Sequence, residues 1–104
     1  MDTLIAPVIS ALKENHAVVN GDEVSRAFEV ARGAHEGQVR KSGEAYITHP
    51  VAVAEILANL GLNPATIIAA LLHDTVEDTP YSLTQLRVDF GDEIADLVDG
   101  VTKL

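Results

Sequence analysis

The segment that limits the possible folds most strictly is an apolar run in the second half of the chain. Residues 65–72 read ATIIAALL, in which a threonine is the single polar side chain. The dipeptide Asn63-Pro64 before this run is a typical helix start, and Pro80 disfavours helical geometry in the residue that precedes it. Because a helix that is apolar on nearly all sides is normally buried by its neighbours, the sequence predicts a central helix over residues 64–78.

The rest of the chain also favours helices. Apolar residues recur every three or four positions, and no run of β-branched residues alternates in the way typical of a strand. The predicted helices cover about residues 4–15, 21–34, 50–60, 64–78 and 82–91, with a sixth from Asp92. Ser82, with Gln85 three residues later, is a capping-box signature at the start of the fifth. Residues 37–49 contain two glycines and lack periodicity, so we expect a loop there that is long for a compact domain. The predicted fold class is all-α.

Length and composition bound the class of protein. A chain of 104 residues with 47% apolar and 22% charged residues is typical of one ordinary globular domain rather than of a disordered chain. The apolar run is far shorter than the roughly 20 residues of a membrane span, and the N-terminus lacks the basic region of a signal peptide. We therefore expect a soluble cytoplasmic protein without a membrane partner.

Charge and cysteine content narrow the possible ligands. Sixteen acidic residues against seven basic ones give a net charge of −9, which argues against binding to nucleic acid or anionic lipid through clustered Lys and Arg. The chain has no cysteine, so a metal ion would be bound by His, Asp, Glu or backbone oxygen. Four histidines are the first candidates for chemistry. Two of them, His16 and His35, lack a suggestive context: His16 is expected to lie in a turn, and His35 is expected to be structural.

Two pairs of ionisable residues end the central helix. His73 and Asp74 follow the apolar run, and Glu77 and Asp78 stand four residues further on, one helical turn beyond the first pair. A divalent cation, or a proton on one of them, would relieve the repulsion between the stacked carboxylates of Asp74 and Asp78. Alternatively, His73 and Asp74 cap or pair with each other at an exposed helix end, and the last turn is simply solvated. An acidic last turn is nevertheless unfavourable, because a helix C-terminus favours cations.

A second group of candidates lies in the predicted loop. His49 stands at its end and could be a third metal ligand, since two imidazoles and a carboxylate with open positions suit Mn²⁺, Fe²⁺ or Zn²⁺. Alternatively, it is a helix-cap histidine. Arg40 and Lys41 are adjacent cations that could bind phosphate or stack on a base, and Ser42 and Tyr46 could contact a nucleotide. The alternative for this group is an ordinary exposed basic loop.

Three motifs together resemble a known family. They are HEGQVRKSGEAYITHP at residues 35–50, LLHDTVEDT at 71–79 and VDGVTKL at 98–104. In this order they resemble the hydrolase domain of RelA/SpoT-type enzymes, which belongs to the HD-domain metal phosphohydrolases, and the resemblance covers about residues 22–104. It implies an HD-domain helical bundle that hydrolyses the 3′-pyrophosphate of (p)ppGpp, a bacterial starvation nucleotide, to GDP or GTP and pyrophosphate with Mn²⁺.

The resemblance also implies roles for individual residues. The Mn²⁺ ligands would be His49, His73 and Asp74. The residues that orient or deprotonate the attacking water would be Glu77 and Asp78. The contacts to the guanine and its neighbouring phosphates would come from Arg40, Lys41, Ser42 and Tyr46.

One ligand of the family lies beyond this chain. In the family a fourth ligand, an Asp, comes from a helix that would follow Leu104. We therefore expect residues 1–104 to be part of an HD hydrolase domain in a longer protein, and longer relatives continue into a (p)ppGpp synthetase domain. By itself the chain is expected to be inactive and to self-associate. The expected contact is an uncovered apolar surface around Ile94, Leu97, Val98, Val101 and Leu104.

Two other functions stay open at this point. The chain could be a non-catalytic regulatory HD module, against which the presence of all five ionisable site residues argues. It could also be an HD phosphohydrolase that acts on another nucleotide, against which the RKSG sequence at residues 40–43 argues.

Overall fold

The structure is a computed structural model that describes residues 3–102. This part of the chain contains six α-helices. They are α1 (Ala6–Asn15), α2 (Gly21–Ala34), α3 (Thr48–Asn59), α4 (Pro64–Asp78), α5 (Leu83–Phe90) and α6 (Asp92–Thr102). Within these residues, β-type pairing is limited to one isolated antiparallel bridge between Val39 and Ala45. None of the described helices is both long and apolar enough to cross a bilayer. The prediction of an all-α fold is confirmed.

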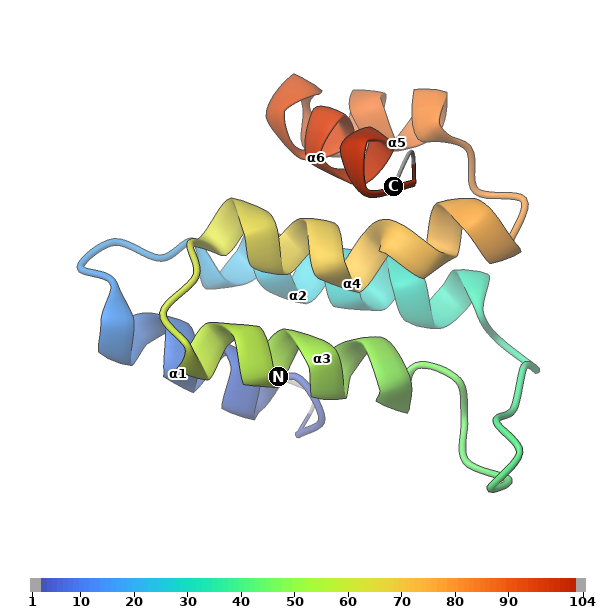
Figure 1. The fold of residues 1–104 in the computed structure, drawn as a ribbon, viewed down its shortest axis with the longest axis horizontal. Helices are drawn as coiled ribbons and strands as arrows, with labels where there is room; N and C mark the ends of the chain where they lie inside the picture. The colour runs from blue at the N-terminus through green and yellow to red at the C-terminus, as the bar shows by residue number, and fades with distance from the viewer. Residues whose placement is uncertain (1–2, 103–104) are drawn as a thin grey trace.

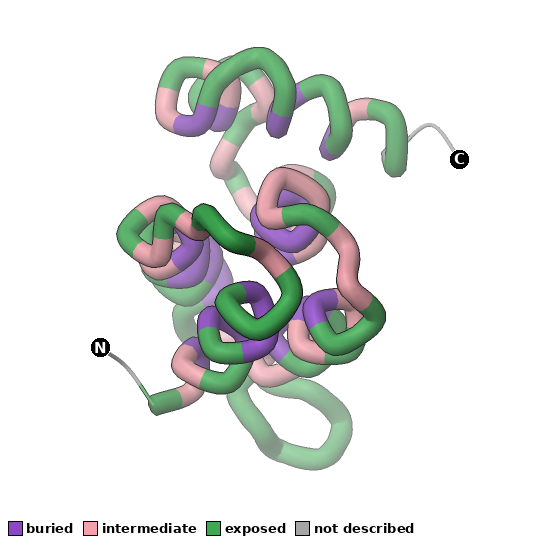
Figure 2. The backbone as a smooth tube through the Cα atoms, turned by 90° about the vertical axis from the view of Figure 1, so that its left-hand side faces the viewer, coloured by how far each residue is buried: buried purple, intermediate pink, exposed green. Residues whose placement is uncertain are grey.

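Helix α4 lies at the centre of the arrangement. It packs against α2, α3 and α6, while α1 packs on α3 and α5 pairs with α6. In Figure 1, α4 runs below α5 and α6 and above α3 and α1, with α2 behind it. Its buried apolar side chains are Ile67, Ile68, Ala69, Leu71 and Leu72. The predicted central helix is confirmed, and Figure 2 shows the buried residues turned toward one another between the helices.

Local hydrogen bonds explain where several helices begin and end. The Asn63 side chain accepts a bond of 2.9 Å from the Thr66 backbone N–H, and the Ser82 hydroxyl accepts one of 3.0 Å from the Gln85 backbone N–H. These are the predicted caps of α4 and α5. After α3, Gly61 adopts a φ of +89°, a left-handed conformation that glycine reaches without steric cost, so the helix stops where the sequence predicts.

The first turn of α3 differs from the sequence prediction. The helix begins at Thr48 rather than at Pro50, so the preceding loop covers residues 35–47 rather than 37–49. Proline is tolerated wherever the backbone N–H needs no partner inside the helix, and this includes the whole first turn. Pro50 therefore occupies the third helical position, and His49 lies within the helix instead of in front of it.

The apolar surface predicted for self-association is only partly exposed. Ile94 and Val98 are buried, whereas Leu97 and Val101 are 38% and 44% exposed. Leu104 lies outside the described residues. The prediction is therefore wrong for Ile94 and Val98, because α6 packs on α4 and α5 and turns these side chains inward. Self-association itself stays a prediction.

Candidate metal centre

The ionisable end of α4 brings three possible metal ligands together. One ligand atom each from His73, Asp74 and Glu77 lies within 4.8 Å of the others. His73 Nδ1 is 3.1 Å from Asp74 Oδ1, and His73 Nε2 is 3.5 Å from Glu77 Oε1. The side chains of His73 and Asp74 are 29% and 19% exposed, so the pair is partly buried rather than at a free helix end. The structure thus contains the pair of His73 and Asp74, which is the alternative to a metal site, and also the contact of His73 with Glu77.

The second oxygen of Asp74 is bonded to a residue of the loop. The Tyr46 hydroxyl donates a hydrogen bond of 2.9 Å to Asp74 Oδ2. Burial raises the pKa of Tyr46 to about 12, helped by this bond and by the charges of Asp74 and Asp78, while the Arg40 charge opposes the shift. Tyr46 is therefore protonated at neutral pH and is the donor. The sequence assigns Tyr46 to the nucleotide and does not predict its contact with Asp74.

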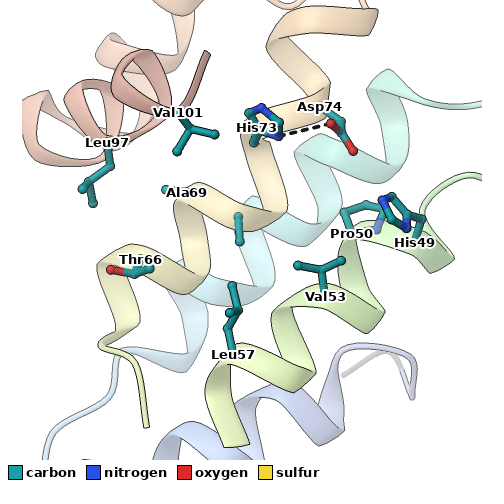
Figure 3. Close-up of a pocket in the computed structure, with 11 residues that line it drawn as sticks. His49, Pro50, Val53, Leu57, Thr66, Ala69, His73, Asp74, Leu97 and Val101 are labelled. Atoms are coloured by element: carbon teal, nitrogen blue, oxygen red, sulfur yellow. Dashed lines mark ion pairs between the residues drawn. The ribbon is translucent and has the colours of Figure 1, made fainter. Parts of the chain in front are cut away.

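An apolar cavity of about 360 Å³ opens beside these residues. It lies between α3, α4 and α6, with His49, His73 and Asp74 at one end (Figure 3). Aliphatic side chains such as Leu57 and Leu97 line much of the rest. The structure thus brings His49, on the α3 wall, to the same cavity as His73 and Asp74. His49 does not belong to the group whose ligand atoms lie within 4.8 Å of one another.

The loop that carries the other predicted nucleotide contacts forms a small hairpin. The Arg40 N–H donates to the Glu44 carbonyl, and the Gly43 N–H donates to the Arg40 carbonyl, each at 2.8 Å. These bonds close a tight turn over Lys41 and Ser42. Arg40, Lys41 and Ser42 are exposed, and none of them lines the apolar cavity or the second described cavity, of about 490 Å³. Their contact with a nucleotide stays a prediction.

The two histidines that the sequence leaves outside the candidate site have protein partners. His35 is 2% exposed, with its Nδ1 3.1 Å from Gln38 Oε1 and its Nε2 3.3 Å from Thr75 Oγ1. His16 Nε2 lies 2.9 Å from the Leu62 carbonyl oxygen. The environment of His35 fits the structural interpretation, and His16 directly follows the last residue of α1.

The donor set at the end of α4 suits a divalent transition-metal ion. It combines the His73 imidazole with two carboxylates, and His49 adds a second imidazole in the wall of the same cavity. Mixed nitrogen and oxygen donors are typical of sites for such ions. With so few protein ligands, positions would be left for water or for a phosphate oxygen. The residues present therefore fit a catalytic metal site better than a closed structural one.

Comparison with known proteins adds independent information. A family model described as HD domain matches residues 27–104. The chain is 55% identical over 101 residues to a probable GTP pyrophosphokinase of Mycobacterium leprae, which covers 97% of this chain and 13% of the relative. It is 61% identical over 75 residues to a guanosine-3′,5′-bis(diphosphate) 3′-pyrophosphohydrolase of Haemophilus influenzae, and the match covers 72% of this chain and 11% of that relative. It is 56% identical over 86 residues to the bifunctional (p)ppGpp synthase/hydrolase SpoT of Escherichia coli, and the match covers 80% of this chain and 12% of that relative. The chain thus spans about an eighth of the length of these relatives.

Proposed function

Because the chain belongs to the HD-domain family, within the RelA/SpoT (p)ppGpp synthase/hydrolase group, we propose that it carries the site that removes the 3′-pyrophosphate from (p)ppGpp. The products are GDP or GTP and pyrophosphate. The observation that carries the proposal is the cluster of His73, Asp74 and Glu77 beside an apolar cavity. A cavity of this kind can receive part of a ligand while the polar end performs the chemistry.

We assign His49, His73 and Asp74 as ligands of Mn²⁺. The two histidines offer neutral imidazole nitrogens, Asp74 offers an anionic oxygen, and all three line one end of the cavity. When bound, the ion supplies positive charge that polarises a phosphoryl oxygen and makes water more acidic. Glu77 and Asp78, in the last turn of α4, orient the attacking water and accept its proton. Both side chains are exposed, so water reaches them directly.

Pyrophosphate release from (p)ppGpp by the product of the complete gene tests the proposal. We expect release that stops when a chelator removes divalent ions and returns when Mn²⁺ is added in excess. Release that continues without metal would contradict the metal site. Hydrolysis of another nucleotide in place of (p)ppGpp would favour an HD phosphohydrolase of different specificity, and hydrolysis of none would favour a non-catalytic regulatory module.

The hairpin loop is the part of the site that we assign to the nucleotide. Arg40 can stack on a base or bind a phosphate through its planar guanidinium, Lys41 adds a point charge, and Ser42 adds a hydroxyl in the same turn. Arg40→Ala and Lys41→Ala should each weaken binding of a non-hydrolysable (p)ppGpp analogue by about 1.5 to 3 kcal/mol, roughly 10- to 150-fold. Mn²⁺ affinity should not change, because these side chains are not metal ligands.

Isothermal titration calorimetry measures both affinities. Lys13→Ala is the control, because it removes a charge from the last turn of α1, outside both described cavities. Unchanged analogue affinity in both loop variants would remove the loop from the binding site.

A second activity and the cellular location concern the natural protein as a whole. Two relatives carry the names GTP pyrophosphokinase and (p)ppGpp synthase/hydrolase, so we propose that the natural protein also synthesises the nucleotide. A synthesis assay with GTP on the same gene product tests this. Cytoplasmic localisation stays a prediction of the sequence.

A further inference from the structure

We propose that Tyr46 is a positioning residue that holds the Asp74 carboxylate in the orientation needed for metal binding. This role rests on the metal site proposed above and extends that site to a loop that precedes α3. The evidence is a series of contacts that joins the Tyr46 hydroxyl to Asp74 and the Tyr46 ring to the core.

The two oxygens of Asp74 are held by different side chains. The Tyr46 hydroxyl donates to Oδ2 at 2.9 Å, and His73 Nδ1 lies 3.1 Å from Oδ1. Two directional contacts on the two oxygens define the plane of the carboxylate. Each carboxylate oxygen has two lone pairs, so the bond from Tyr46 leaves one lone pair of Oδ2 for a metal ion. Hydrogen bonds to metal-binding carboxylates orient them and strengthen metal binding in this way.

The Tyr46 ring is itself held by buried groups. It lies against the His35 ring with the centroids 4.6 Å apart, and the Tyr46 N–H donates to the Gln38 carbonyl at 3.0 Å. His35 is buried, and its Nε2 lies 3.3 Å from the hydroxyl of Thr75 in α4. Tyr46 is thus connected through His35 to the residue that follows Asp74. This arrangement keeps the hydroxyl of a loop residue in a constant position relative to α4.

Charged side chains of both signs surround the Tyr46 hydroxyl. Asp74 and Asp78 both place negative charge near it, and Arg40 is the positive group that opposes them. Tyr46 lines the second described cavity, of about 490 Å³, and not the cavity that contains His49 and the other proposed ligands. Asp74 accepts the proton of this hydroxyl in a hydrogen bond, so the hydroxyl already has a protein partner.

The test compares two Tyr→Phe substitutions in the product of the complete gene. Tyr46→Phe removes the hydroxyl and keeps the ring that lies against His35. Tyr81→Phe is the matched control, because the Tyr81 hydroxyl donates a bond of 2.7 Å to Asp89 Oδ2, away from the cavity of the proposed ligands. Tyr46→Phe should weaken Mn²⁺ binding by about 10- to 100-fold, whereas Tyr81→Phe should leave it unchanged. Both variants should show a similar decrease in Tm, since each loses one Tyr–Asp bond.

Calorimetric titration with Mn²⁺, and with a non-hydrolysable (p)ppGpp analogue in the absence of metal, separates the possible outcomes. Weaker Mn²⁺ binding by Tyr46→Phe alone, with analogue binding retained, supports the positioning role. Unchanged Mn²⁺ affinity, or an equal loss in both variants, overturns that role and leaves the proposed function standing. Loss of analogue affinity with Mn²⁺ affinity retained overturns it in favour of a nucleotide contact. A wild-type protein that binds no Mn²⁺ overturns the proposed metal site, and the positioning role with it.

Discussion

Asp74→Asn should reduce metal-dependent release of pyrophosphate by about a thousandfold or more. The substitution replaces an anionic oxygen with a neutral amide of nearly the same shape, so it removes charge from the site and keeps an oxygen that can accept the bond from Tyr46. A catalytic metal ion contributes several kcal/mol to the stabilisation of transition-state charge, and about 1.4 kcal/mol corresponds to a tenfold change in rate. Mn²⁺ affinity should fall together with the rate, because the ion loses its anionic ligand.

Asp96→Asn is the matched control for this substitution. Asp96 lies on α6, its side chain is 70% exposed, and it pairs with Arg87 at 2.9 Å, outside the cavity that Asp74 lines. Its removal should leave both the rate and the Mn²⁺ affinity at wild-type values, since exposed ion pairs contribute little. An Asp74→Asn protein that binds Mn²⁺ normally but hydrolyses slowly would assign Asp74 to the activation of water. Retention of both properties would exclude Asp74 from the site.

Helix boundaries could be predicted from the sequence where a side chain caps the helix. Asn63 and Ser82 accept the backbone hydrogen bonds that their positions predict, so α4 and α5 begin where expected. Helix α3 has no side-chain cap at its N-terminus. Pro50 is compatible with any position in the first turn, so the sequence alone could not decide between a start at Thr48 and one at Pro50.

The part of the site on α4 could be predicted because helical spacing is a local property. His73 and Glu77 are four residues apart and approach to 3.5 Å across one turn. The bond from Tyr46 to Asp74 joins residues that are 28 positions apart, and it depends on the path by which the loop returns to α4. Neither the residue types nor their spacing predicts the path of this loop. The sequence therefore identifies Tyr46 as a candidate site residue but does not predict its contact with Asp74.

Tertiary packing also decides which side of an amphipathic helix is free. The periodicity of α6 identifies its apolar residues, and the sequence predicts that they form one uncovered surface. In the structure, contact with α4 and α5 buries Ile94 and Val98 and leaves Leu97 and Val101 partly exposed at the cavity. Periodicity shows that a helix has an apolar face, whereas only the packing shows which of its residues the neighbouring helices cover.

The largest expected loss of stability comes from the buried face of α4, and a pair of isoleucines tests it. Ile68 in α4 is 1% exposed, whereas Ile56 in α3 is 60% exposed. Ile68→Ala should lower the free energy of unfolding by about 2 to 5 kcal/mol, because it removes buried methyl groups and leaves a cavity. Ile56→Ala should change the free energy of unfolding by less than about 0.5 kcal/mol. The gain in helix propensity is the same for both substitutions, so the difference between them reports burial.

Urea denaturation measures this difference through the midpoints and slopes of the unfolding transitions. A domain of this size has a total stability of about 5 to 15 kcal/mol, so the loss at Ile68 is a large fraction of the whole. Saturating Mn²⁺ should restore part of that loss, because an ion that binds only the folded state shifts the equilibrium toward it. The same ion should restore nothing in an Ile68→Ala, Asp74→Asn double variant, which lacks the proposed anionic ligand. Equal effects of Ile68→Ala and Ile56→Ala would show that α4 is not the buried centre on which the candidate site depends.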